Sequence, residues 1–166
     1  MHFGLWHTRP PRTFRALRDA TQPNRKGQLL FKHIMVPVDL AHPDKLTRAL
    51  GVMGDLARHY DAQVTLVGVT GPQPGSVAHS PDEFAQKLLK FAAIQAEIFG
   101  LPPIATHPIT ANDPAIDLDR ALEQAVHDLG ADLVVMGSHI PRRFDLGSHG
   151  GRIASHTDIS VMLVRD

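Results

Sequence analysis

The chain has 166 residues, which suits one domain with a short extension better than two domains. Apolar residues make up 43% of it and charged residues 20%, as in a globular protein that can bury a full core. The absence of cysteine excludes disulfides, thiolate metal sites and thiol catalysis, and the net charge of zero provides no overall field to attract nucleic acid.

The first thirty residues differ in charge from the rest. They hold six basic side chains against one acidic one, a net charge of +5, while the remainder holds eleven basic and sixteen acidic side chains, a net of −5. We interpret residues 1–30 as a basic extension and residues 31–166 as the domain. The extension is a solvated tail, an organelle transit peptide or a segment that touches an anionic membrane. No apolar run reaches the roughly 20 residues that cross a bilayer, and we expect a cytoplasmic protein.

Strand-like and helix-like segments alternate after the extension. An apolar run at residues 33–38 predicts a buried strand. Pro43 and Asp44 begin a helix with an apolar stripe that extends to Tyr60, and residues 64–69 predict a second strand. The next helix has Ser80 as its N-cap, Pro81 in its first turn, Glu83 completing a capping box, and Gly100 at its end. Its core face is expected to hold Phe84, Leu88, Phe91, Gln95 and Ile98.

The second half of the chain continues the alternation. Residues 104–110 predict a strand whose Pro108 lacks an amide donor, which favours the edge of a sheet. Asp113 and Pro114 begin a helix that ends at Gly130 and is expected to bury Ile116, Ala121, Leu122, Ala125, Val126 and Leu129. A strongly apolar strand at residues 133–136, a helix from about 148 to 156 and a last strand at 159–164 complete the domain.

This order of elements predicts an α/β fold: a five-stranded parallel sheet with helices on both faces. With the third strand at the edge, the strand order is 3-2-1-4-5, as in flavodoxin-like and Rossmann-like sheets. Ligands bind such sheets beyond the carboxyl ends of the strands, where the order reverses. The reversal falls between the first and fourth strands, so Asp39 and Gly137 are expected to face one crevice.

The segment that follows the fourth strand resembles an anion site. Gly137, Ser138 and His139 are followed by Gly147 and Ser148 at a helix start, where free amide donors and the helix dipole favour a phosphate. The arginines Arg142, Arg143 and Arg152 are candidates to neutralise its charge. The alternative is that glycine and serine merely serve a strand-to-helix turn.

Several segments, in order, are similar to the universal stress protein family. They are residues 34–39 (IMVPVD), 113–115 (DPA), 130–139 (GADLVVMGSH), 146–148 (LGS), 153–156 (IASH) and 160–165 (SVMLVR). The resemblance covers about residues 31–166. It implies the same five-stranded sheet and a homodimer paired through the last strand, Val161–Val164, which would otherwise expose an apolar edge. A regulatory protein partner is also expected, and no nucleic acid.

The resemblance also implies roles for individual residues. The acid after the first strand, Asp39, meets adenine or ribose, and Val69 lines the base pocket. The motif G-x2-G-x9-G-[ST], which holds phosphates, begins at Gly137 and closes at Gly147 and Ser148. The candidate nucleotide-binding residues are Pro37, Val38, Asp39, Val69, Met136, Gly137, Ser138, His139, Gly147 and Ser148.

Two departures from that motif bear on the ligand. Ile140 replaces the second glycine, and six residues rather than nine separate it from Gly147. Isoleucine does not adopt positive φ cheaply, and the shorter loop reaches less far. The expected ligand is ATP, ADP or AMP with Mg²⁺, and contacts of the AMP or ADP kind are favoured over a grip on a triphosphate.

The resulting hypothesis is a regulatory stress-response protein with an adenine-nucleotide pocket. One alternative is a family member that binds no nucleotide and acts through protein contacts, and another is a slow nucleotide hydrolase. No catalytic residue is assigned, because Ser138 and Ser148 lack the G-x-S-x-G elbow of hydrolases. No metal site is expected from His139, His149 and His156, and Asp39 is equally suited to closing a turn.

Overall fold

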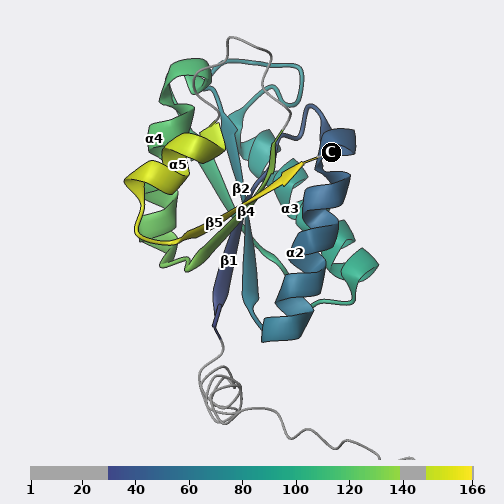
Figure 1. Ribbon diagram of the computed structural model, residues 1–166. Coiled ribbons are helices and arrows are strands. Elements are labelled where there is room, and N and C mark those ends of the chain that lie inside the picture. The colour runs from purple at the N-terminus through teal and green to yellow at the C-terminus, as the bar shows by residue number, and fades with distance from the viewer. Residues whose placement is uncertain (1–29, 139–148, 166) are drawn as a thin grey trace, which may run out of the picture.

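The computed structural model describes residues 30–138 and 149–165, which form a parallel sheet between two layers of helices (Figure 1). The strands are β1 (His33–Pro37), β2 (Gln63–Thr70), β3 (Ala105–Thr110), β4 (Leu133–Ser138) and β5 (Ser160–Arg165). The helices are η1 (Pro43–Leu46), α2 (Thr47–Tyr60), α3 (Pro81–Phe99), α4 (Pro114–Leu129) and α5 (His149–His156). The proposed basic extension lies, apart from Leu30, outside the described residues.

The five strands are all parallel in the order β3-β2-β1-β4-β5, which confirms the predicted topology. Pro108 lies on β3, the edge strand, where its missing amide hydrogen costs no pairing within the sheet. In Figure 1, α2 and α3 cover one face of the sheet and α4 and α5 cover the other. No helix within the described residues is both long and apolar enough to cross a bilayer.

The core consists of two apolar clusters, one on each face of the sheet. Successive strand residues point to opposite faces, so Ile34 and Val36 pack in the cluster under α2 and α3, whereas Met35 packs in the one under α4. Ile34, Met35 and Val134 are fully buried. Burial on both faces explains why these strands read as continuous apolar runs rather than as alternating ones.

The α3 helix begins at the predicted residue, with one difference in the capping box: the Glu83 side chain bonds the His79 amide instead of the Ser80 amide. The Ser80 hydroxyl accepts a hydrogen bond from the Glu83 amide at 3.1 Å, and Pro81 occupies the first turn, where its missing amide costs nothing. The Glu83 carboxylate accepts from the His79 amide, one residue before the N-cap. Gly100 ends the helix with φ of 61°, in the left-handed region that glycine adopts readily.

Some local predictions were wrong, and geometry explains them. Ile98 is 63% exposed, because the buried stripe of α3 drifts with the 3.6-residue period onto Ala92 and Ala96. Ile116, in the first turn of α4, is 79% exposed. The helix predicted from residue 43 is divided into the 3₁₀ turn η1 and α2. The fourth strand continues two residues beyond Met136, because Gly137 and Ser138 pair with β5.

Candidate functional site

The reversal in strand order opens a gap at the carboxyl ends of β1 and β4. These two strands pair through Ile34 with Leu133 and Met35 with Val134, near the start of each strand. Beyond those pairs, β1 stays with β2, and the Val38 amide donates to the Val67 carbonyl at 2.8 Å. The divergence leaves a pocket of about 290 Å³, close to the lower limit of roughly 300–1,000 Å³ for small-molecule sites.

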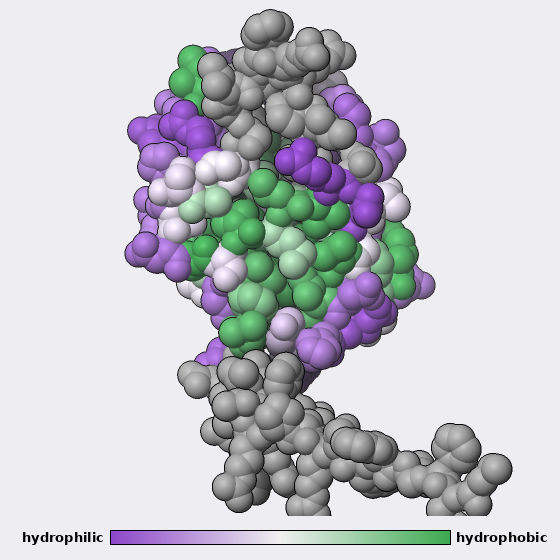
Figure 2. Space-filling view, in the orientation of Figure 1, coloured by the Kyte–Doolittle hydropathy of each residue, from purple (hydrophilic) through white to green (hydrophobic). Residues whose placement is uncertain are grey.

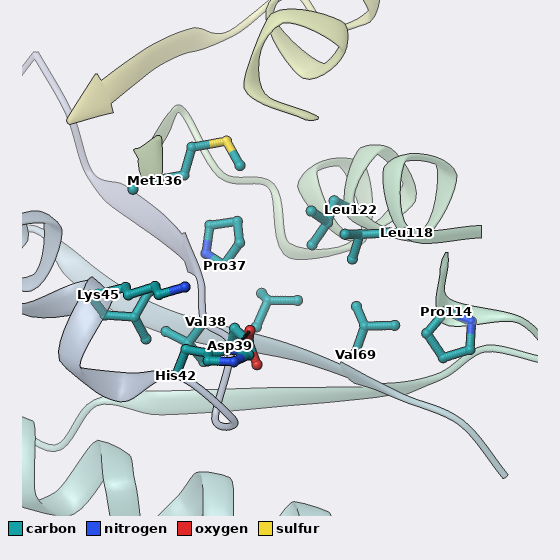
Figure 3. A pocket seen from close by; sticks show the side chains of 13 residues that line it. Pro37, Val38, Asp39, His42, Lys45, Val69, Pro114, Leu118, Leu122 and Met136 are labelled. Atoms are coloured by element: carbon teal, nitrogen blue, oxygen red, sulfur yellow. Dashed lines mark hydrogen bonds and ion pairs between the residues drawn. The ribbon is translucent and has the colours of Figure 1, made fainter. Parts of the chain in front are cut away.

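The pocket has one polar side and one apolar side (Figure 3). Asp39, His42 and Lys45 come from the turn that follows β1 and from η1. Val69 of β2, with Leu118 and Leu122 of α4, forms the wall that faces them. The lining residues are Pro37, Val38, Asp39, His42, Lys45, Leu46, Val67, Val69, Pro114, Leu118, Leu122, Met136 and Gly137.

Asp39 forms the turn after β1 and also faces the pocket. One carboxylate oxygen accepts a hydrogen bond from the Ala41 amide at 2.9 Å, and the other lies 2.7 Å from Nδ1 of His42. The His42 amide donates to the Asp39 carbonyl, which completes the turn. The structural role considered for Asp39 is therefore observed. Its side chain stays 62% exposed, and each carboxylate oxygen keeps capacity for a further donor.

Two opposing influences act on the charge of Asp39. Partial burial raises its pKa, while the hydrogen bonds from His42 and from the Ala41 amide lower it, and the charges of His42 and Lys45 lower it further. The net effect holds the pKa of Asp39 below its ordinary value. Asp39 is therefore ionised at neutral pH and can accept hydrogen bonds from ligand hydroxyl or amino groups.

Gly137 ends the apolar part of β4 at the rim of the pocket. Its φ is not in the left-handed region, and a Cβ added there would meet the Lys45 carbonyl at 3.6 Å, an ordinary contact. Neither the backbone conformation nor packing among the described residues demands glycine here. The lack of a side chain leaves the β4 backbone open to the pocket, as a close-approaching ligand requires.

Six of the predicted binding residues line this one pocket: Pro37, Val38, Asp39, Val69, Met136 and Gly137. Ser138 ends β4 next to them and pairs with Arg165. His139, Ile140, Arg142, Arg143, Gly147 and Ser148 lie outside the described residues. Arg152, a candidate cation, is paired with Asp119 at 3.2 Å.

Two charged or titratable lining residues, His42 and Lys45, were not among the predicted binding residues. The signal that points to them is their spacing. They follow Asp39 by three and six residues. Two successive turns, closed by hydrogen bonds from the His42 amide to the Asp39 carbonyl and from the Lys45 amide to the His42 carbonyl, join the three residues. Five apolar lining residues were also not predicted: Leu46, Val67, Pro114, Leu118 and Leu122. Those on α4 reach the site only because α4 crosses the sheet face.

A parallel sheet with a pocket at its order reversal defines a doubly wound α/β domain of the kind that binds ligands at a switch point. The family model of the universal stress protein family matches residues 30–165, and the chain belongs to that family. Comparison with curated proteins gives no match.

Similar solved structures share the fold. One is a universal stress protein in complex with cAMP, 23% identical, with a TM-score of 0.61, covering 81% of this chain and 97% of its own. The universal stress protein from Archaeoglobus fulgidus in complex with dAMP is 18% identical over 81% and 98%, with a TM-score of 0.56. A family protein from Arabidopsis thaliana with AMP bound is 20% identical over 81% and 90%, with a TM-score of 0.55.

Proposed function

We propose that this protein binds an adenine nucleotide in the pocket between β1 and β4 and acts as a nucleotide-responsive regulator. The observation that carries the proposal is the pocket itself, in which ionised Asp39 faces an apolar wall of Val69, Leu118 and Leu122. A flat base suits the apolar wall, and ribose hydroxyl groups suit the carboxylate. The relatives crystallised with cAMP, dAMP and AMP support this ligand class.

The sequence after β4 favours a nucleoside monophosphate. The pocket volume of about 290 Å³ suits a base and a ribose, and a phosphate chain would extend beyond it. Ile140 and the short loop that precedes Gly147 agree with this preference. We therefore expect AMP to bind at least as tightly as ATP with Mg²⁺, and we expect binding rather than efficient hydrolysis, measured as phosphate release.

The test is a thermal-shift and calorimetric titration with AMP, ADP and ATP, each with and without Mg²⁺. A ligand at one hundred times its Kd stabilises the folded state by about 2.7 kcal/mol, which corresponds to a shift on the order of 5–10 °C in Tm for a domain of this size. The absence of any shift at millimolar nucleotide, with no nucleotide retained by the purified protein, contradicts the proposal.

A variant pair makes the test specific for the pocket. Asp39→Asn keeps an acceptor for the Ala41 amide but removes the charge. We expect it to weaken AMP binding about tenfold or more, because hydrogen bonds to charged groups contribute roughly 1.5–3 kcal/mol. The control is Asp55→Asn, which removes an exposed carboxylate of α2 that pairs with Arg58, away from the pocket.

We further propose that the protein forms a homodimer through β5. The outer edge of β5 has no neighbouring strand among the described residues, and Met162 on it is 39% exposed. Figure 2 shows a broad apolar area on the face that carries β5, with hydrophilic residues around it. An unpaired apolar edge is a template for pairing with a second chain. A family member that binds no nucleotide and acts only through protein contacts would use the same surface.

A further inference from the structure

We infer that Lys45 is the residue that receives the phosphate of the bound nucleotide and so makes the pocket selective for nucleotides over nucleosides. This inference rests on the proposed function. It assigns the phosphate contact to η1, beside the end of β4.

The position of Lys45 supports the assignment. It is the third residue of η1, and its amide donates to the His42 carbonyl at 3.2 Å, which holds the turn. Its own carbonyl lies 3.6 Å from the place a Cβ on Gly137 would take, so η1 packs directly on the end of β4. The Lys45 backbone therefore lies beside Gly137, and Lys45, Gly137 and Asp39 line the same pocket. In Figure 3 its side chain extends from η1 toward the other lining side chains.

The ammonium group of Lys45 is available to a ligand. Within residues 30–138 and 149–165 it makes no ion pair closer than 4.0 Å, although it attracts Asp39 at longer range. The Asp39 carboxylate is engaged by the Ala41 amide and by His42. Arg152, one of the three arginines considered for this role, is engaged by Asp119, and the other two, Arg142 and Arg143, lie outside the described residues.

The charge balance of the pocket requires a cation if a phosphate is to enter. Asp39 supplies one negative charge, which alone repels an anion. Among the described lining residues, Lys45 supplies the ammonium group that offsets this charge. An ammonium is a compact point charge with three donors, well suited to a phosphate that is held mainly by electrostatics. A nucleoside has no phosphate to pair with the Lys45 ammonium group, so we expect Lys45 to affect the binding of the nucleotide alone.

The experiment compares AMP with adenosine on the full chain by calorimetry. Lys45→Gln is expected to weaken AMP binding about tenfold or more while changing adenosine binding by less than about twofold. Lys45→Arg, which keeps the charge, should retain most of the AMP affinity. The control Lys90→Gln removes an exposed lysine of α3, outside the pocket, and should change neither affinity.

The two hypotheses fail in different ways. If the wild-type protein binds both compounds and Lys45→Gln leaves AMP affinity unchanged, or weakens both compounds equally, the role of Lys45 is wrong and the proposed function stands. If the wild-type protein binds neither compound, both are wrong. A decrease in AMP affinity with rising salt in the wild type, lost in Lys45→Gln, supports the electrostatic contact.

Discussion

Asp39 shows how one carboxylate can close a turn and still face a ligand. Its hydrogen bonds with the Ala41 amide and His42 orient it, while more than half of its side chain remains exposed. A carboxylate held in one orientation loses little conformational entropy when a ligand binds. The turn therefore prepares Asp39 for binding rather than competing with it.

The lowered pKa of Asp39 leads to a test of its partner. We expect His42→Ala to raise the pKa of Asp39 toward its ordinary value, because the variant loses the largest influence that lowers it. A lowered folded-state pKa contributes stability above the ordinary pKa, and this stability is lost as pH falls through the folded value. The contribution is small, since solvent screens a group this exposed.

A carboxyl-carbon NMR titration of Asp39 in the wild type and in His42→Ala measures this shift directly. His127→Ala, at an exposed position near the end of α4, is the control and should leave the titration of Asp39 unchanged. An unaltered pKa in His42→Ala would show that the hydrogen bond does not stabilise the ionised carboxylate.

The sequence identified some pocket residues and missed others for physical reasons. Asp39 and Gly137 were predictable because ligands bind in the crevice where the strand order reverses, and each residue comes at the carboxyl end of a strand beside that reversal. Lys45 was missed because residues 43–60 were interpreted as one amphipathic helix, whereas Lys45 lies in η1, a separate short turn before α2. Leu118 was missed because its place depends on how α4 packs over the sheet.

At the scale of elements, the contact between β2 and α3 depends on one glycine. A Cβ at Gly68 would lie 2.9 Å from the Phe84 ring, which is buried and rigid. We expect Gly68→Ala to lower the free energy of unfolding by about 1–3 kcal/mol, as overpacking usually does. Urea denaturation followed by circular dichroism measures the change.

Gly51→Ala is the matched control for that substitution. Gly51 lies inside α2, and a Cβ there would have no neighbour within 4 Å. We expect it to raise the free energy of unfolding by about 0.5–1 kcal/mol, the usual cost of glycine in a helix interior. A Gly68→Ala variant as stable as the wild type, or stabilised as Gly51→Ala is expected to be, would mean that the β2–α3 contact is not tight.

Element order was predictable because each signal has a local cause. Pro108 marked the edge strand, and Ser80, Pro81 and Glu83 marked a helix start, since missing or unpaired amide groups are properties of the residue and its near neighbours. Burial at helix ends was less predictable. Ile98 and Ile116 have the composition of core residues, but their exposure depends on where each helix crosses the sheet.

At the scale of the whole molecule, the proposed β5 dimer predicts a response to charge. We expect the wild-type protein to be dimeric by light scattering at micromolar concentration, and Met162→Lys to shift it toward monomer, because the substitution places a charge on the pairing edge. Ile94→Lys is the control, since Ile94 is also apolar and exposed (54%) but lies on α3. A monomeric wild type, or equal dissociation in both variants, contradicts the proposal.

The Asp132 carboxylate accepts hydrogen bonds from the amides of Lys32 and His33, the latter 99 residues away in the chain. The β1–β4 pairing that it secures therefore closes a far longer loop than the pairings of β1 with β2 or β4 with β5. A chain emerging from the ribosome can pair β1, β2 and β3 early, but it has no crevice until β4 is complete. The pocket therefore forms late in synthesis, and we expect a fragment that ends before residue 133 not to bind nucleotide.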